Sequence, residues 1–293
     1  MAERFPGAAD VAPVQQGLWS SAYGFRIGSD ELVVRFSSVR DDFDKDARVS
    51  RHAPAGLPVP RIVDVGEALG GYYAVSARLP GRHLDRLGGA ELRRVLPSLF
   101  ACLDAVREMD ISDTSGYGLW HGDGTGEEPS WRTALLDAAK EDPARGPAWR
   151  ERLAASALAS RAFDSGSARL RELLIHCPEE RHLVHSDLLH WNVLVTDDRV
   201  SGLLDWGSSI YGDFVYDIAW LTFWWPWYPA WREIDIGREA KAHYVRIGLE
   251  VDSLDERLEA CELRIGLGAL VWYSSRRDIT NLELAARRIE ELI

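Results

Sequence analysis

The stretch that decides the fold reads Val184-His185-Ser186-Asp187-Leu188-Leu189-His190-Trp191-Asn192-Val193-Leu194-Val195, and Leu203-Leu204-Asp205-Trp206-Gly207 follows shortly after it. The pattern is His-x-Asp-x-x-x-x-Asn between two apolar segments, with a second Asp after another apolar pair. Phosphoryl transfer needs a carboxylate that orients the acceptor hydroxyl, and a carboxamide and a second carboxylate that hold magnesium ions. We therefore interpret Asp187 as the catalytic base and Asn192 and Asp205 as metal ligands.

The same residues have a simpler interpretation, in which Asp187 and Asn192 only cap the backbone of a turn. We prefer the phosphotransfer site, because these offsets arise by chance in roughly one in a hundred chains of this length, and the flanking strands lower that further. His185 is expected to hold the loop by hydrogen bonding and not to exchange protons. Asp213 and Asp217 are expected to be structural, with Asp217 capping a helix or fixing the catalytic loop.

Beyond this loop, the chain resembles the aminoglycoside phosphotransferases, which are antibiotic kinases with a protein-kinase-like fold, and most closely their hygromycin B phosphotransferase branch. The similar segments are spread over nearly the whole chain: Arg51-His52, Leu57-Pro58-Val59-Pro60, Thr114-Ser115-Gly116-Tyr117-Gly118, Arg181-His182-Leu183-Val184-His185, Asp205-Trp206, Tyr211-Gly212-Asp213, Phe223-Trp224-Trp225-Pro226-Trp227 and Leu263-Arg264-Ile265-Gly266-Leu267.

The resemblance implies an α+β, protein-kinase-like two-lobed fold, with an antiparallel sheet in a small N-terminal lobe and a mostly helical C-terminal lobe. It implies that ATP or GTP, with Mg²⁺, supplies a γ-phosphoryl group to a hydroxyl of a cationic aminocyclitol antibiotic such as hygromycin B. Such an enzyme confers antibiotic resistance.

Local patterns place the lobe boundary. The run from Trp19 to Phe36 predicts two paired strands with a turn at Gly28-Ser29-Asp30. Residues 72–77 are rich in strand formers and end at Arg78-Leu79-Pro80-Gly81, which predicts the last strand of the small lobe and a hinge. We therefore assign residues 1–78 to a nucleotide-binding lobe and residues 79–293 to a catalytic and substrate-binding lobe, since 293 residues exceed what one core usually serves.

The second lobe should be mostly helical. Apolar residues recur at helical spacing in residues 92–106, where Pro97 predicts a kink, and helical patterns return around 134–139, 168–175, 254–273 and the C-terminal segment. Residues 116–129 are rich in glycine and predict a flexible, irregular loop.

Arg35 lies in the strand where many kinases have a phosphate-binding lysine. Its planar guanidinium would hold two phosphate oxygens at once, and the hygromycin branch is similar in having arginine here. When the chain is aligned with that branch through Leu57-Pro58, the acidic partner expected for Arg35 is Asp46. Lys45, next to it, is the alternative phosphate ligand. A surface ion pair that contributes little is the other interpretation of Arg35.

Two further segments are candidates for nucleotide contact. The first hairpin has no Gly-rich loop, so Ser20 or Ser21 would meet a phosphate oxygen, although capping a turn is the commoner use of serine. In the hinge, backbone groups of Ser76, Ala77 and Arg78 are candidate adenine contacts.

The charge is unevenly distributed. Residues 1–80 carry 9 basic and 10 acidic side chains, whereas residues 81–293 carry 25 and 36, within a net charge of -12. This argues against a nucleic acid partner, because phosphate binding needs a basic face. An acidic field attracts a polycationic substrate, although solubility alone also explains it.

The candidate acceptor contacts in this acidic half are Trp224, Trp227, Glu233, Asp235 and Asp278. An exposed ring can stack on the apolar face of a sugar, and carboxylates can pair with ammonium groups. The alternative is that the rings belong to the core and the acids to the solvated surface.

The remaining features predict a cytoplasmic monomer with no membrane segment. The three cysteines, Cys102, Cys177 and Cys261, are widely spaced, which fits reduced thiols. The N-terminus has no signal-peptide pattern, and the apolar run 220–228 is too short to span a bilayer. Two rival functions stay open: a kinase of the same fold for a macrolide, amino alcohol or sugar, and a nucleotide-binding pseudokinase.

Overall fold

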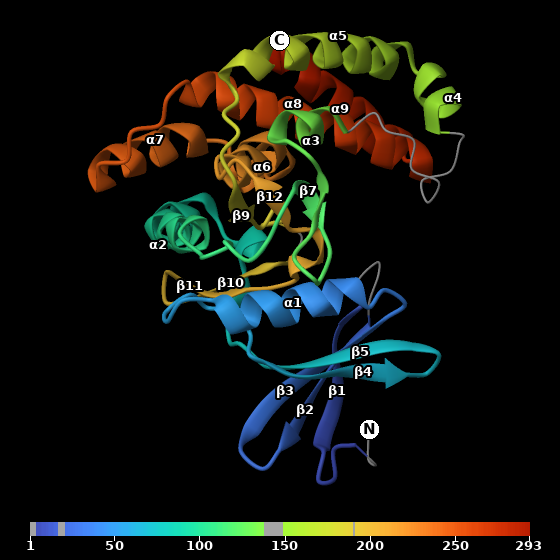
Figure 1. Cartoon of the computed structure of the whole chain (residues 1–293), viewed down its shortest axis with the longest axis vertical. Coiled ribbons are helices and arrows are strands. Elements are labelled where there is room, and N and C mark those ends of the chain that lie inside the picture. Colours follow the sequence, from blue (N-terminus) through green and yellow to red (C-terminus); the bar gives the residue numbers. More distant parts are fainter. Residues whose placement is uncertain (1–3, 17–20, 138–148, 190) are drawn as a thin grey trace. The chain divides into compact units, whose positions relative to one another are not determined.

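The computed structural model describes residues 4–16, 21–137, 149–189 and 191–293, and the chain forms two compact units (Figure 1). The first unit combines the described residues up to Ser115 with Trp120–Thr125 and Asp187–Ser209. The second combines Gly116–Leu119, Gly126–Ser186 and Ile210–Ile293. Strands dominate the N-terminal part and helices the C-terminal part, which confirms the α+β class. The division at residues 78 and 79 stays a prediction.

The first unit contains a five-stranded antiparallel sheet in the order β1-β2-β3-β5-β4. Its strands are β1 Ala9–Gln16, β2 Ser21–Ile27, β3 Asp30–Ser37, β4 Ile62–Ala68 and β5 Gly71–Ala77. The predicted hairpin and last strand are confirmed as β2, β3 and β5, while residues 17–20 lie outside the described residues. Gly28 has a φ of +58°, which suits the tight turn between β2 and β3.

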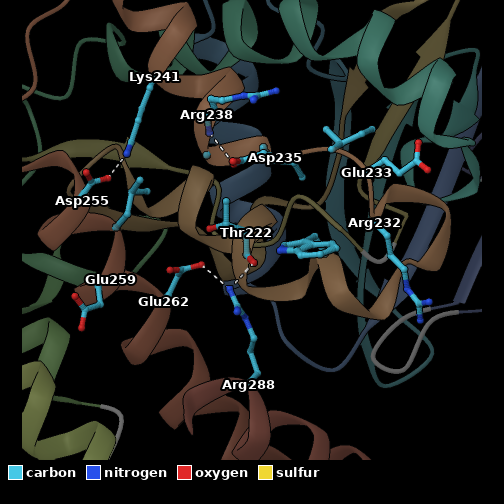
Figure 2. Close-up of a pocket in the computed structure, with 15 residues that line it drawn as sticks. Thr222, Arg232, Glu233, Asp235, Arg238, Lys241, Asp255, Glu259, Glu262 and Arg288 are labelled. Atoms are coloured by element: carbon cyan, nitrogen blue, oxygen red, sulfur yellow. Dashed lines mark hydrogen bonds and ion pairs between the residues drawn. The ribbon is translucent and has the colours of Figure 1, made fainter. Parts of the chain in front are cut away.

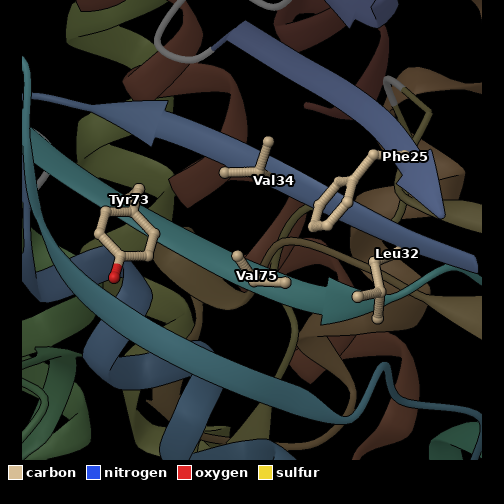
Figure 3. Close-up of a cluster of buried hydrophobic side chains, with 5 residues drawn as sticks. All are labelled: Phe25, Leu32, Val34, Tyr73 and Val75. Atoms are coloured by element: carbon tan, nitrogen blue, oxygen red, sulfur yellow. The ribbon is translucent and has the colours of Figure 1, made fainter. Parts of the chain in front are cut away.

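One face of this sheet carries a compact apolar cluster (Figure 3). It consists of Phe25, Leu32, Val34, Tyr73 and Val75, all buried. Leu32 and Val34 alternate along β3 as Tyr73 and Val75 do along β5, because every second side chain of a strand points to the same face. Burial of each such side chain stabilises the fold by about 1.5–3 kcal/mol.

The rest of the first unit frames the loop that carries the motif. It contains α1 Asp41–His52, α2 Gly89–Arg107 and a second sheet in the order β11-β10-β6. That sheet is formed by β6 Arg82–His83, β10 Val193–Thr196 and β11 Arg199–Leu203. The predicted helix is confirmed as α2, which continues on both sides of Pro97. Asp187 and Asn192 precede β10, and Asp205 follows β11.

The second unit contains a four-stranded sheet in the order β8-β7-β12-β9. Its strands are β7 Tyr117–Trp120, β8 Gly126–Glu128, β9 His182–Val184 and β12 Ile210–Gly212. The prediction of an irregular loop over residues 116–129 is therefore wrong for β7 and β8. A Cβ on Gly126 would lie 2.6 Å from the amide nitrogen of Tyr117, so this glycine allows close backbone approach and does not signal flexibility.

Helices make up the rest of the second unit. They are α3 Trp131–Leu136, α4 Trp149–Ala154, α5 Ala157–Leu173, α6 Tyr216–Trp224, α7 Ile236–Ile247, α8 Leu254–Arg276 and α9 Ile279–Leu292, joined in places by short 3₁₀ turns. The helical patterns predicted at 168–175, 254–273 and the C-terminal segment are confirmed. The pattern at 134–139 corresponds to α3 and extends beyond the described residues.

Helix α8 is the centre of this helical layer and packs against α4, α5, α6 and α9 (Figure 1). A Cβ on Gly266 would lie 2.7 Å from Ile289 Cγ1 and 2.8 Å from Phe223 Cε2, so glycine here lets α6 and α9 approach α8. In the described ranges, no helix has the length and apolar character needed to cross a membrane.

Candidate active site

The loop before β10 is closed by its own polar side chains. The Asn192 amide nitrogen donates to the backbone carbonyl of Asp187 at 2.8 Å and to its carboxylate at 2.9 Å. The amide nitrogen of Asn192 is thus engaged with Asp187, and the role of Asn192 as a metal ligand stays a prediction. Asn192 then leads directly into the buried strand β10.

Asp217 fixes the segment that precedes Asp187. In the second unit, its carboxylate accepts hydrogen bonds from the backbone amides of His185 at 3.0 Å and Ser186 at 2.8 Å. Asp217 is buried in the first turn of α6. The structural role predicted for Asp217 is therefore confirmed, and it acts on the residue immediately before the candidate base.

Asp213 is also structural, as predicted. The guanidinium of Arg257 donates to both of its carboxylate oxygens at 2.7 and 2.8 Å. Asp213 also accepts from the amide of Val215 at 3.1 Å, just before α6 begins. Both Asp213 and Arg257 are buried, so the pair has little contact with solvent.

The second motif carboxylate, Asp205, lies beside Arg35 and Asp46 in the first unit. Arg35 donates through one nitrogen to Asp46, and another lies 3.5 Å from the Asp205 carboxylate. The other oxygen of Asp46 accepts from the amide of Trp206 at 2.8 Å. The predicted Arg35–Asp46 ion pair is thus present. Asp205 keeps 49% of its side chain exposed, whereas Asp46 keeps 4%.

The turn after Asp205 is fastened to α1. Lys45 donates to the carbonyl of Gly207 at 2.8 Å. A Cβ on Gly207 would lie 2.9 Å from Asp42 Cγ, so a side chain here would force Asp42 or the turn to shift. Burial raises the pKa of Asp42; Lys45 opposes that shift, and the charges of Asp205 and Asp41 add to it. Lys45 therefore anchors backbone here, and its role as a phosphate ligand stays a prediction.

Sequence reasoning missed three residues around this site. The Asp42 side chain packs closely against Gly207, two residues after Asp205. His83 donates from Nδ1 to the carbonyl of Trp191 at 2.9 Å. Asp42 lies one helical turn before Asp46, so its position on the same face of α1 was available from the spacing. No pattern in the sequence links His83 to Trp191.

The candidate nucleotide contacts lie at strand ends of the first unit. Ser21 is the first residue of β2, and Ser76 and Ala77 end β5. The amides of Ala77 and Arg78 each donate at 2.9 Å to backbone carbonyls of the same unit. A purine contact at these two residues would therefore use their carbonyl oxygens. Ser20, the alternative to Ser21, lies outside the described residues.

The candidate acceptor rings belong to an aromatic cluster of the second unit. Trp224 is buried, with its ring centroid 5.0 Å from Trp227 and 4.9 Å from Phe223. Trp227 is partly exposed and stacks on Phe223 at 5.9 Å. Trp224 is thus mainly a core residue, while Trp227 keeps surface that a ligand can reach.

Glu233 and Asp235 line a cavity of about 660 Å³ in the second unit (Figure 2). Five carboxylates and four cationic side chains line it, and several are paired, including Arg288 with Glu262 at 3.2 Å. Asp235 also caps α7 by accepting from the amide of Arg238 at 2.9 Å. Asp278 lines no part of this cavity and caps α9. The roles of the three acids toward an acceptor stay predictions.

Comparisons with known proteins agree with this geometry. The model of the phosphotransferase enzyme family matches residues 10–249. The hygromycin-B 4-O-kinase of Escherichia coli is 34% identical over 275 residues, which cover 92% of this chain and 76% of that protein.

Solved structures are similar over nearly the whole chain. A thermostable mutant of aminoglycoside phosphotransferase APH(4)-Ia, in a ternary complex with AMP-PNP and hygromycin B, matches with a TM-score of 0.85 at 29% identity, covering 99% of this chain and 95% of that one. The macrolide 2′-phosphotransferase MphH of Brachybacterium faecium matches with a TM-score of 0.59 at 18% identity, covering 98% and 95%. The second match shows a shared fold alone.

Proposed function

This chain belongs to the phosphotransferase enzyme family, and we propose that it moves the γ-phosphoryl group of ATP or GTP to a hydroxyl of an aminocyclitol antibiotic such as hygromycin B. The family resemblance predicted from the sequence is confirmed, and the chain is an O-phosphotransferase. The proposed acceptor follows that of the Escherichia coli relative, which matches at 34% identity over most of both chains. Phosphorylation of such an antibiotic would give resistance to it.

The observation that carries the proposal is the set of polar groups gathered in the first unit. Asp187 and Asn192 are hydrogen bonded, and Asp205 lies within 3.5 Å of the Arg35 guanidinium. Asp187 would orient the acceptor hydroxyl and take its proton late in the transfer, as the aspartate of a kinase loop does. Arg35, held by Asp46, would neutralise phosphate charge through its planar fork.

Asn192 and Asp205 have the donor atoms that Mg²⁺ requires. Magnesium is usually held by one or two protein oxygens together with nucleotide phosphates and water, so no larger cage is needed. The described ranges contain no cluster of three or more His, Cys, Asp or Glu side chains suited to a metal ion. When bound, the ion neutralises charge on the phosphates during transfer. Asn192 and Asp205 would hold it, and Arg35 would share the same phosphate oxygens.

The acidic excess of residues 81–293 supports a cationic acceptor. Within that part, Glu233 and Asp235 are exposed, and Trp227 and Asp278 are partly exposed. Asp235 and Asp278 already cap helices, and Trp224 is buried. We therefore rank Trp227 and Glu233 first among the predicted acceptor contacts. The three cysteines are free thiols, which favours the proposed cytoplasmic location, and we propose that the chain acts as a monomer.

The test is phosphate transfer with magnesium and either ATP or GTP, measured against hygromycin B, other aminoglycosides, macrolides and simple amino alcohols. Asp187→Ala serves as the inactive variant, and Asp30→Ala, at an exposed hairpin position, as the matched control. Phosphorylation of hygromycin B that Asp187→Ala loses and Asp30→Ala retains is the expected result. Transfer only to another acceptor would refute the proposed substrate. Nucleotide binding without any transfer would identify a pseudokinase.

A further inference from the structure

We propose that Trp191 is an acceptor-binding residue, whose indole forms a platform for the aminocyclitol beside the catalytic aspartate. This inference rests on the proposed function and adds a contact that neither the motif nor the acidic candidates supply. It is carried by the exposure of Trp191, by its backbone conformation and by its place in the loop.

Trp191 is exposed where similar residues are buried. Of twelve tryptophans in the chain, several are at most 2% exposed, namely Trp120, Trp131, Trp149, Trp206 and Trp231. Trp191 keeps 37% of its area exposed. Leu188 and Leu189 in the same loop are buried, so the loop is anchored by its leucines and does not need the indole for packing. The exposed part of the indole is a flat apolar surface on which a ligand can pack.

The backbone of Trp191 is strained. Its φ is +77°, a left-handed conformation that a bulky side chain adopts at a cost in free energy and that asparagine or glycine adopts more readily. The hydrogen bond from His83 Nδ1 to the Trp191 carbonyl, 2.9 Å long, holds this conformation. Residues with strained backbone conformations are frequent at ligand-binding sites, where the surrounding structure holds them in that conformation. The backbone that carries the indole is therefore held in place before any ligand binds.

Trp191 lies next to the chemistry. It immediately precedes Asn192, whose amide bonds to the Asp187 carboxylate at 2.9 Å. A ligand that places a hydroxyl at Asp187 therefore brings its neighbouring atoms near residue 191. An aminocyclitol suits an indole face in two ways, because its C–H groups pack on an aromatic surface and its ammonium groups are attracted by the ring quadrupole.

Trp272 provides a matched control. It is also 37% exposed, but it lies on α8 and the Arg276 guanidinium already covers its ring, 4.0 Å from the centroid. Trp191→Asn removes the ring and keeps a residue type that tolerates positive φ, while Trp191→Tyr keeps an aromatic face. Trp272→Ala removes an equally exposed indole elsewhere.

The experiment measures KM for hygromycin B, KM for the nucleotide and acceptor-independent nucleotide hydrolysis in all three variants. We expect Trp191→Asn to raise the KM for hygromycin B by about 5- to 30-fold. Trp191→Tyr should recover most of that loss, and the nucleotide KM and hydrolysis should stay at wild-type values. Trp272→Ala should match wild type in every measurement.

Three results would overturn the proposal in distinguishable ways. An unchanged acceptor KM in Trp191→Asn, with active wild type, refutes the platform and leaves the proposed function intact. An equal rise in acceptor and nucleotide KM would mean that Trp191 positions the loop and binds no acceptor. If wild type phosphorylates no aminocyclitol, the proposed function and the platform both fail.

Discussion

Replacing Arg257 with methionine should destabilise the protein strongly, because it leaves the buried Asp213 carboxylate without a compensating charge. Arg257 is 3% exposed and Asp213 is fully buried, and two hydrogen bonds of 2.7 and 2.8 Å join them. A third contact runs from Arg257 to Glu180 at 3.4 Å. Burial acts to lower the pKa of Arg257, but its bonds to Asp213 and the charges of Asp213 and Glu180 outweigh burial and raise that pKa. The guanidinium is thus held in its charged form.

The size of the effect follows from what remains. In Arg257→Met the aliphatic volume is roughly kept, but the Asp213 carboxylate loses its compensating charge. Removing one partner of a buried ion pair costs about 3–5 kcal/mol, which corresponds to a fall in unfolding temperature of about 5–8 °C for a chain of this size. Scanning calorimetry measures this directly. The double variant Arg257→Met with Asp213→Asn should recover at least half of the loss, since no uncompensated charge is left.

The matched control is Arg94→Met. Arg94 pairs with Asp198 at 2.8 Å, but both side chains are about half exposed, and exposed ion pairs contribute little to stability. Its unfolding temperature should therefore stay close to that of wild type. If Arg257→Met also unfolds at the wild-type temperature, the argument from burial is wrong.

Three further predictions concern the loop and the thiols. Asp187→Asn should lower kcat by about 10²- to 10⁴-fold with little change in nucleotide KM, measured by steady-state kinetics; an unchanged kcat would exclude Asp187 as the base. Asp217→Asn should lower the free energy of unfolding by about 1–3 kcal/mol, because an amide group replaces an oxygen that accepts a hydrogen bond from a loop amide. Denaturant titration measures this free energy, and a wild-type value would contradict the prediction. Burial raises the pKa of Cys102 to about 11 from 9.0, so the folded state keeps this proton longer than the unfolded state. The contribution of Cys102 to stability should be constant below about pH 9 and fall between about pH 9 and 11. Cys102→Ala should therefore show a smaller loss of stability than wild type when thermal unfolding is followed across that range.

The sequence predicted the strands around the motif better than it predicted residues 116–129. The apolar segments after Asn192 and before Asp205 are local features of the sequence. The structure contains both of them as strands, β10 and β11. The Arg35–Asp46 pair was predictable only through the family resemblance, because no local pattern links a strand residue to one carboxylate on the next helix. Its role in binding phosphate stays a prediction.

Residues with two competing uses were the difficult ones. Asp235 and Asp278 precede helical segments, and a carboxylate there caps the helix before it serves any ligand. The glycines of residues 116–129 were misleading in the same way. Glycine marks flexible loops and close backbone approach equally well, and only the partner backbone distinguishes the two. In this chain Gly126 packs against β7, and strand β8, which Gly126 begins, was therefore not predicted.

Helix α1 explains why such assignments need tertiary structure. Its acids are equivalent in the sequence, yet Asp46 binds the amide of Trp206 while Asp44 pairs with Arg40 at the surface. Helical spacing puts Asp42 and Asp46 on the same face, but it does not say what that face meets. The answer comes from the turn at residues 205–207, which lies against α1 where Gly207 has no side chain. A Cβ at residue 207 would lie 2.9 Å from Asp42 Cγ and 3.1 Å from Asp42 Cβ, so either the Asp42 side chain or the turn would have to shift. The turn that follows the candidate metal ligand Asp205 thus packs on α1 at a glycine that carries no chemistry of its own.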